Sequence, residues 1–501
     1  MDGLTHLQAG FLTALSAPNL LLAWLGVLLG TLVGVLPGLG PVATMAMLLP
    51  ALNGLDATSS LILLAGIYYG AQYGGSTTAI LINTPGEASS VMTALDGYQM
   101  AQQGRAAAAL AISAWGSFFA GCVGTLLMAV FAPILAQLAF TFGPAEHFAL
   151  LTLGLVGAMV LANGAPLKAA AMTLLGLLLA QINTDVISGV ARYSLGLPEL
   201  SDGIGFVVIA MGVFGVGEVL VTLERPLAQR RSVSMIKQDG RLTRDDVREA
   251  VPAVLRGTAI GSVLGVLPGG GLLLATFASY ALERKWVRNP RHPFGQGAIQ
   301  GVAGPESANN AAAQTSFIPM LTLGVAPNAV MALLLGVLTL KGIAPGPEVL
   351  STHSTLFWAL VASMWIGNAM LLVLNLPLIG LWCRLLLMPY PYLYPAILTF
   401  CCIGAYSLSN SSFDVFLVGV FALGGYALRK LDFELAPLML GYVVGAPLEE
   451  KLRQALLLAR GDWAYIVSRP MAATFLLTAL GLAACATLSR LRKARHPLLA
   501  A

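Results

Sequence analysis

The sequence predicts an all-α polytopic membrane protein made of two inverted repeats, each with a broken, re-entrant Gly-Pro hairpin, and about 10–12 transmembrane segments. Three observations lead to this prediction: the composition, the recurrence of long apolar runs, and a heptapeptide that occurs twice. Of the 501 residues, 57% are hydrophobic and only 10% are charged, so the chain cannot present a water-compatible surface. Lipid must therefore be its main solvent.

Apolar runs recur along the chain, and several reach the roughly 20 residues needed to cross a hydrocarbon layer of ~30 Å. Examples are 106–131, 148–162, 204–223 and 471–488. The net charge of +4 is small and its basic residues are dispersed, so nucleic acid is not an expected partner. The five cysteines lack paired spacing, which indicates packing residues.

Basic residues orient the chain, because Lys and Arg accumulate in cytoplasmic loops. None precedes Arg105, whereas 224–256 is rich in both, so this loop is expected in the cytoplasm and the N-terminus in the periplasm. The predicted organisation is a first transmembrane repeat (1–223), a cytoplasmic basic loop (224–256) and a second transmembrane repeat with an extra C-terminal helix (257–501).

The duplicated heptapeptide reads GVLPGLG at 34–40 and GVLPGGG at 265–271. Proline removes a backbone donor and glycine has little helical preference, so both copies should break a helix. The second copy lies between two basic stretches, and the surrounding segment 257–282 should therefore enter and leave on one face. An odd number of crossings in the first copy inverts the second, as in many secondary transporters.

Each break offers two kinds of binding group. The N-terminus of the following half-helix attracts an anion, and the free carbonyl groups suit a cation such as Na⁺. The substrate-binding candidates here are Gly38, Gly40, Gly269 and Gly270, and the ion-coupling candidates are Leu36, Pro37, Leu267 and Pro268. The alternative is that these glycines only permit close helix packing.

Runs of hydroxyl and amide side chains follow each break, and they suit a carboxylate that must be released again. The substrate-binding candidates in them are Ser76, Thr77, Thr78, Asn83 and Thr84 in the first half and Ser307, Asn309 and Asn310 in the second. Interhelical hydrogen bonding is the alternative interpretation. Glu306, which abuts the second run, and Thr322 complete the ion-coupling candidates, whereas Glu87 and Asp96 are read equally well as surface-loop residues.

Enzymatic signatures such as HExxH, GxSxG and a Walker-type loop are absent, so no catalytic residue, cofactor or activity as an enzyme is expected. The two stretches 30–50 (GTLVGVLPGLGPVATMAMLLP) and 68–101 (YYGAQYGGSTTAILINTPGEASSVMTALDGYQMA) resemble the large membrane subunit of the tripartite tricarboxylate transporters, the TctA family. The second-half stretches 304–336 and 340–347 resemble it too.

The resemblance implies a multi-pass permease of the bacterial inner membrane. Its expected partners are a small TctB-like membrane subunit and a periplasmic TctC-like solute-binding protein. The implied function is uptake of a citrate-like di- or tricarboxylate coupled to Na⁺ or H⁺, with one domain moving against a scaffold. A channel-like or scaffolding subunit without a coupled substrate site is the alternative.

Overall fold

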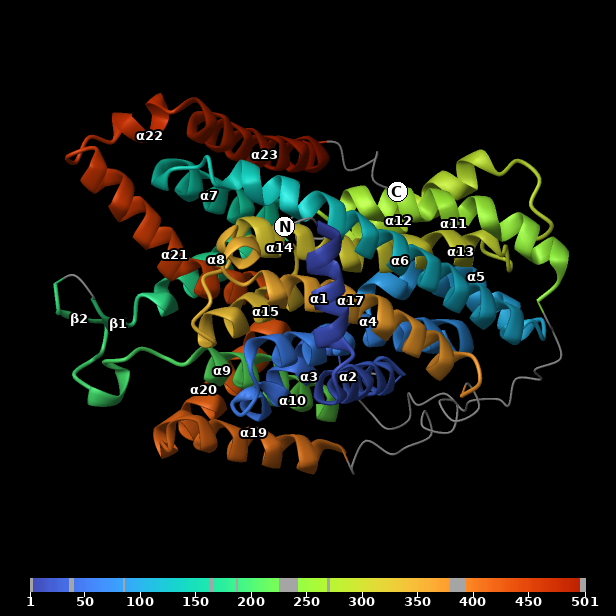
Figure 1. Cartoon of the computed structure of the whole chain (residues 1–501), viewed down its shortest axis with the longest axis horizontal. Coiled ribbons are helices and arrows are strands. Elements are labelled where there is room, and N and C mark those ends of the chain that lie inside the picture. Colours follow the sequence, from blue (N-terminus) through green and yellow to red (C-terminus); the bar gives the residue numbers. More distant parts are fainter. Residues whose placement is uncertain are drawn as a thin grey trace.

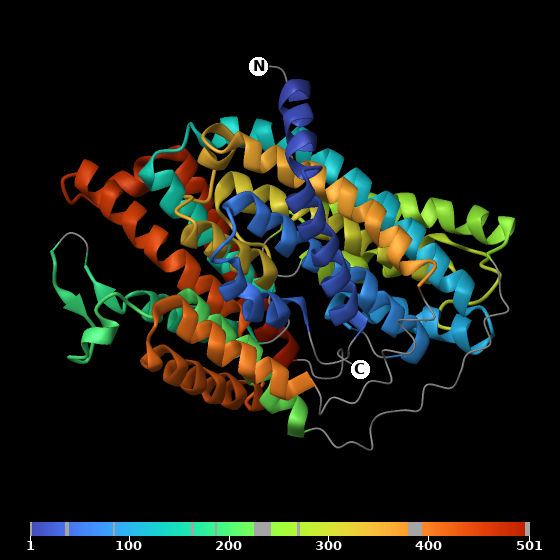
Figure 2. The ribbon, with the colours of Figure 1, turned by 60° about the horizontal axis from the view of Figure 1, so that its bottom comes forward.

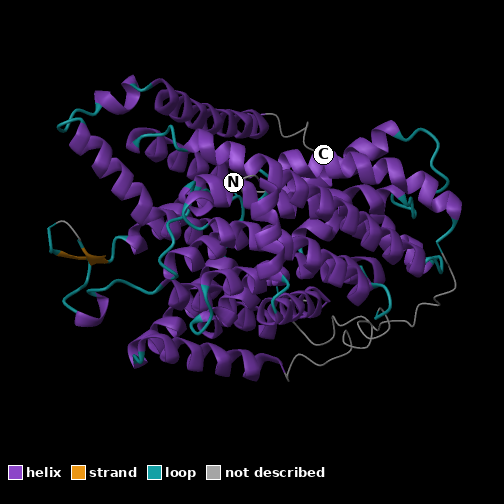
Figure 3. Cartoon of the chain, viewed as in Figure 1, coloured by secondary structure: helices purple, strands orange, loops and turns teal. Residues whose placement is uncertain are grey.

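The structure is a computed structural model that describes residues 3–35, 40–83, 86–161, 165–185, 188–224, 242–267, 271–378 and 393–495. Within these ranges the chain is almost entirely helical, as Figure 3 shows, with strands only in one short hairpin. The all-α class predicted from the sequence is confirmed.

The N-terminal part contains helices of very different length. In chain order they are α1 (Gly3–Ala14), α2 (Ala17–Val35), α3 (Pro41–Leu48), α4 (Ala57–Ile82), α5 (Val91–Gln102), α6 (Ala106–Ala139), α7 (Pro144–Leu161), α8 (Pro166–Ala180), α9 (Phe206–Ala210) and α10 (Gly217–Glu224). Short turns of 3₁₀ helix lie at η1 (Leu49–Leu52), η2 (Ala88–Ser90) and η3 (Pro198–Leu200), and a π-helical turn, η4 (Met211–Val216), joins α9 to α10.

The C-terminal part continues with another series of helices. They are α11 (Arg244–Leu264), α12 (Gly271–Trp286), α13 (Gln300–Thr315), α14 (Phe317–Leu323), α15 (Ala329–Leu340), α16 (Glu348–Ser351), α17 (Ser354–Asn375), α19 (Leu393–Ser409), α20 (Ser412–Lys430), α21 (Ala436–Leu458), α22 (Ala464–Ser468) and α23 (Pro470–Arg495). Helix α11 starts inside the predicted basic loop and runs on past residue 256. The three-part division of the chain stays a prediction.

Among the described residues, four helices are long and apolar enough to span a bilayer: α2, α6, α17 and α20. Seven further apolar helices of 10–17 residues are shorter than this. These lengths support a multi-pass membrane protein, while the predicted number of crossings stays a prediction. The long helices α6 and α17 run side by side through the molecule (Figures 1 and 2), and the Trp365 indole donates to the Cys122 carbonyl across their contact at 3.2 Å.

Two seams of small residues bring helices into backbone contact. A Cβ on Gly70 would lie 2.7 Å from the Val27 carbonyl oxygen, and one on Gly261 would lie 2.2 Å from the Ala308 carbonyl oxygen. The facing pairs are Gly26–Gly66, Gly30–Gly70 and Gly34–Gly74 between α2 and α4, and Gly257–Gly304, Gly261–Ala308 and Gly265–Ala312 between α11 and α13. Small residues are required because any larger side chain would push these helices apart.

A short antiparallel hairpin projects from the helical body between α8 and η3 (Figure 1). Its strands are β1 (Asn183–Thr184) and β2 (Ala191–Arg192). Arg192 pairs with Glu449 at 2.7 Å, and Arg453 pairs with Asp185 at 2.9 Å, so two charged contacts fix the hairpin to α21.

Replacing a seam glycine by alanine should destabilise the protein. We expect Gly70→Ala and Gly261→Ala each to cost about 1–3 kcal/mol, because the added methyl group overlaps backbone atoms that cannot move independently. Unfolding of the purified protein in mixed micelles measures this. Gly424→Ala on α20, where a Cβ meets nothing within 4 Å, is the matched control and should not be destabilising. Equal stability of all three variants would contradict the packing described here.

Candidate functional site

Helix α13 is the centre of the candidate site, since every one of its residues is buried although many of them are polar. Its small residues face α11 and α12, as at Gly304, where a Cβ would lie 2.9 Å from the Ser279 hydroxyl. Glu306, Ser307, Asn309 and Asn310 face α4, α5 and α6. The helix therefore brings amide, hydroxyl and carboxyl groups into the interior of the protein.

Glu306 is fully buried at the meeting point of four helices. Its carboxyl group contacts the hydroxyls of Ser76 on α4 and Thr93 on α5, and the Ser113 hydroxyl on α6 lies at 3.3 Å. None of the ion pairs in the described part of the chain involves Glu306. Neutral hydroxyl groups are thus its hydrogen-bond partners.

Gln72, one helical turn before Ser76 on α4, connects three elements. Its amide nitrogen donates to Glu87 Oε2 at 2.9 Å, and its carbonyl oxygen accepts from Asn309 Nδ2 at 2.8 Å and from the Ser89 hydroxyl at 3.3 Å. The chain segment before η2 is thereby tied to α13 through α4. Glu87 and Glu306 thus belong to one polar cluster.

The polar contacts continue along α6. Asn310 Nδ2 donates to the Ser117 hydroxyl at 2.6 Å and to the backbone carbonyl of Glu306 at 3.2 Å. One turn further on, the Asn368 side chain of α17 packs against Gly121, and its carbonyl oxygen accepts from the Tyr73 hydroxyl at 3.4 Å. Amide groups therefore line the contact of α4, α6, α13 and α17.

Several buried atoms around this contact have no hydrogen-bond partner in the described structure. They are Glu87 Oε1, Ser307 Oγ, Asn309 Oδ1, both amide atoms of Gln314, and Asn368 Nδ2. Buried polar atoms are normally satisfied, because an unsatisfied one costs about 1–3 kcal/mol. Such a concentration of unused donors and acceptors is typical of a site that binds a polar ligand.

The structure brings some of the predicted residues together. Ser76, Glu306, Asn309 and Asn310 belong to the cluster, and Ser307 faces Gly116 of α6 beside it. Thr77 and Thr78 instead bond to carbonyls of their own helix, at Tyr73 and Gly75. The functional role assigned to each residue stays a prediction.

The remaining predicted residues lie away from the cluster or outside the described residues. Asn83 is exposed at the left-handed end of α4, Thr322 bonds to the Ile318 carbonyl in α14, Gly40 precedes α3, and Leu267 is exposed. Leu36, Pro37, Gly38, Thr84, Pro268, Gly269 and Gly270 lie outside the described residues.

Sequence reasoning missed six polar residues at this contact. They are Gln72, Thr93, Ser113, Ser117, Gln314 and Asn368. Gln72 precedes Ser76 by four residues and so shares its helix face, which is a signal that helical periodicity offers. Ser113 and Ser117 show the same four-residue spacing in α6, but they and Asn368 are separated by apolar residues, so no polar run marks them.

Asp96, for which the sequence left a surface loop open, is fully buried in α5. Its carboxylate accepts from the backbone N–H groups of Gly295, Gly297 and Ala298 at 2.8–2.9 Å and from the Tyr280 hydroxyl at 2.9 Å. All of these donors come from the second half of the chain. Asp96 therefore fastens the α12–α13 connection to α5, and its hydrogen bonding is complete.

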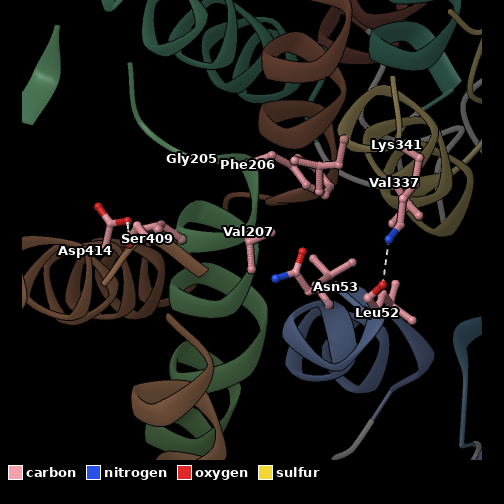
Figure 4. Close-up of a pocket in the computed structure, with 12 residues that line it drawn as sticks. Leu52, Asn53, Gly205, Phe206, Val207, Val337, Lys341, Ser409 and Asp414 are labelled. Carbon is pink, nitrogen blue, oxygen red and sulfur yellow. Dashed lines mark hydrogen bonds between the residues drawn. The ribbon is translucent and has the colours of Figure 1, made fainter. Parts of the chain in front are cut away.

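A pocket of about 310 Å³ lies elsewhere, between η1, α9, α15 and the α19–α20 turn (Figure 4). It contains none of the predicted residues. Its Lys341 ammonium already donates to the carbonyls of Leu52 and Leu55, and its Asp414 accepts from Ser409 at 2.5 Å. The polar cluster is the better candidate, because the charged groups of the pocket are already satisfied.

One family of known proteins matches most of the chain. The model of the "Tripartite tricarboxylate transporter TctA family" matches residues 20–440. The "Uncharacterized 52.8 kDa protein in TAR-I ttuC' 3'region" of Agrobacterium vitis is 52% identical over 99% of this chain and 98% of its own length. The "Uncharacterized protein in TAR-II ttuC' 3'region" of the same organism is 54% identical over 47% of this chain and 97% of its own length. No solved structure matches.

Asp96 should act on stability and not on transport. We expect Asp96→Asn to lower the free energy of unfolding by about 1–3 kcal/mol, because a neutral amide oxygen accepts from the three backbone N–H groups more weakly than a carboxylate and the amide nitrogen removes the acceptor of the Tyr280 hydroxyl. Unfolding in mixed micelles measures the loss, with Asp202→Asn, at an exposed position, as the control. Unchanged stability of Asp96→Asn would show that the clamp contributes nothing.

Proposed function

Since the chain belongs to the tripartite tricarboxylate transporter TctA family, we propose that it takes up a citrate-like di- or tricarboxylate across the bacterial inner membrane by cation-coupled symport. It acts as the large permease subunit together with a small membrane subunit and a periplasmic solute-binding protein. The observation that carries the proposal is the buried cluster of amide, hydroxyl and carboxyl groups with unpartnered atoms at the contact of α4, α6, α13 and α17.

The chemistry of this cluster suits a carboxylate that must be bound and then released. Amide and hydroxyl groups donate hydrogen bonds to carboxylate oxygens without the tight attraction of a buried arginine or lysine. In the closed contact Asn309 Nδ2 donates to the Gln72 side-chain carbonyl instead. When the helices separate, donors such as Asn309 Nδ2 and the Ser307 hydroxyl become available to the substrate.

Two inverted halves give this contact its alternating access. The supporting observation is the pair of small-residue seams, α2 on α4 and α11 on α13, which place Gly34 and Gly265 of the duplicated heptapeptide at equivalent positions. In the proposed elevator-type motion, the unit formed by α11, α12 and α13 moves against α4, α5 and α6, so that the contact between them opens. Such a motion exposes one site to the two sides in turn.

Transport should depend on the amides of α13. We expect Asn309→Ala to reduce uptake about tenfold or more, since a hydrogen bond to a charged ligand contributes about 1.5–3 kcal/mol. The measurement is uptake of labelled citrate and related di- and tricarboxylates by proteoliposomes that contain all three components. Thr478→Ala, at an exposed position of α23, is the control and should leave uptake unchanged.

Two results would contradict the proposal. If Asn309→Ala and a combined Ser307→Ala, Asn309→Ala variant both take up carboxylate at the wild-type rate, the cluster does not lie on the transport path. A carboxylate flux that depends on neither the sodium gradient nor the proton gradient would instead identify a channel-like subunit.

A further inference from the structure

The part of the chain around β2 carries large apolar side chains away from the helical body. Residues 188–199, here called the projecting segment, contain Val190, Tyr193, Leu195 and Leu197, all of which are exposed, Tyr193 by 66% and Leu195 by 86%. Figures 1 and 2 show the segment standing clear of α8 and α9, which precede and follow it in the chain. No helix of the described structure covers these side chains.

The projecting segment is built for water and not for lipid. Among the described residues, the backbone N–H groups of Ser194, Leu195 and Gly196 donate to no backbone carbonyl. Irregular backbone of this kind is not exposed to the hydrocarbon region of a bilayer, where each polar group needs a partner inside the protein. Glu199 and Asp202, which are exposed as well, also require water. Large apolar side chains that are exposed to water mark a surface for another protein.

The backbone holds two of these side chains outward in an unfavourable conformation. Tyr193 and Leu195 have φ of 51° and 52°, in the left-handed region that bulky L residues avoid. The other described non-glycine residues with positive φ follow helix ends, where this conformation is common: Asn83, Asn410, Asp432 and Arg460. Tyr193 and Leu195 close no helix, so their conformation calls for a reason outside the local fold.

Charged contacts make the base of the projecting segment rigid. Arg192, the residue before Tyr193, donates to Glu449 at 2.7 Å, to Gln181 at 2.8 Å and to the Asn183 side chain at 2.9 Å. Arg453 pairs with the same Glu449 at 2.7 Å. A segment that is held in place before binding loses little conformational freedom when a partner docks.

The projecting segment lies opposite the basic end of the molecule. In both views α5 and α11 lie on the side away from it, and Arg105 follows α5 while Arg244 begins α11. Since Lys and Arg accumulate on the cytoplasmic side, that end faces the cytoplasm and the projecting segment faces the periplasm.

The charges of the segment select among partners on that side. Glu199 and Asp202 are acidic, and the positive charge of Arg192 is paired with Glu449. Anionic lipid headgroups and the same acidic segment of a second copy would be repelled. A soluble protein with an apolar depression rimmed by Lys or Arg fits both the exposed anchors and the charges.

We propose that the projecting segment is the docking site of the periplasmic solute-binding protein, with Tyr193 and Leu195 as the central anchors and Leu197 beside them. The inference rests on the proposed transport function and identifies where its soluble partner binds. Glu199 and Asp202 attract the basic rim of that partner and orient it.

The test measures binding of the solute-binding protein that supports wild-type uptake, loaded with citrate, to the two membrane subunits in lipid nanodiscs. We expect Leu195→Asn and Tyr193→Asn each to weaken binding about tenfold or more, as loss of a central anchor does. Asparagine tolerates the left-handed conformation, so these variants remove the side chain and keep the backbone. Val247→Asn, at an exposed position of α11, is the control and should bind as wild type.

Uptake by proteoliposomes separates docking from the transport site. For Leu195→Asn we expect slow uptake at a low concentration of the binding protein and the wild-type maximal rate at a high concentration, because the cluster on α13 is untouched. The double variant Glu199→Gln, Asp202→Asn should associate more slowly than wild type and respond less to salt. A lowered maximal rate of Leu195→Asn at saturating binding protein would contradict a pure docking role.

A photo-reactive phenylalanine analogue in place of Leu197 identifies the occupant directly. We expect a cross-link to the solute-binding protein, whereas a cross-link only to lipid or to a second copy of this chain would overturn the inference. Wild-type affinity of Leu195→Asn and Tyr193→Asn would overturn it as well, while the transport function stands. Absence of binding-protein-dependent uptake of any carboxylate by wild type would overturn the transport function itself.

Discussion

The arrangement of the protein depends on one constraint: a polar helix, α13, is buried along its whole length. Each of its polar groups must find a partner inside the protein, because neither lipid nor bulk water reaches it. Small residues on one face let α11 and α12 approach the backbone, and serine, threonine and glutamine side chains from α4, α5 and α6 meet the other face. The neighbouring helices satisfy part of α13 and leave the Ser307 hydroxyl, Asn309 Oδ1 and the Gln314 amide without a partner in the described structure.

The class of fold could be predicted from the sequence because composition and apolar run length are global properties. The duplicated GVLPG heptapeptide also pointed to two related regions, and small-residue seams end at both copies. The sequence did not predict which helices pack against each other. The contact of Gly257 with Gly304 joins residues in separate helices, and the intervals between such glycines do not identify the partner helix.

The candidate site was predictable where polar residues cluster in sequence and not where they cluster only in space. Ser76, Glu306, Asn309 and Asn310 stand in conspicuous polar runs. Ser113, Ser117 and Asn368 do not, since apolar residues separate each of them from the other polar residues of its helix. The burial of Asp96 was equally hidden, because its donors are backbone N–H groups about 200 positions away and any residue type except proline can supply them.

The clamp at Asp96 has a consequence for biosynthesis. Its donors at Gly295, Gly297 and Ala298 are translated 199–202 residues later, which takes roughly 10–40 seconds at about 5–20 residues per second. During that interval the nascent first half holds a carboxylate whose partners do not yet exist. Helix α5 can therefore make these hydrogen bonds only after the second half has been translated. A chain that terminates before Gly295 lacks all three of them.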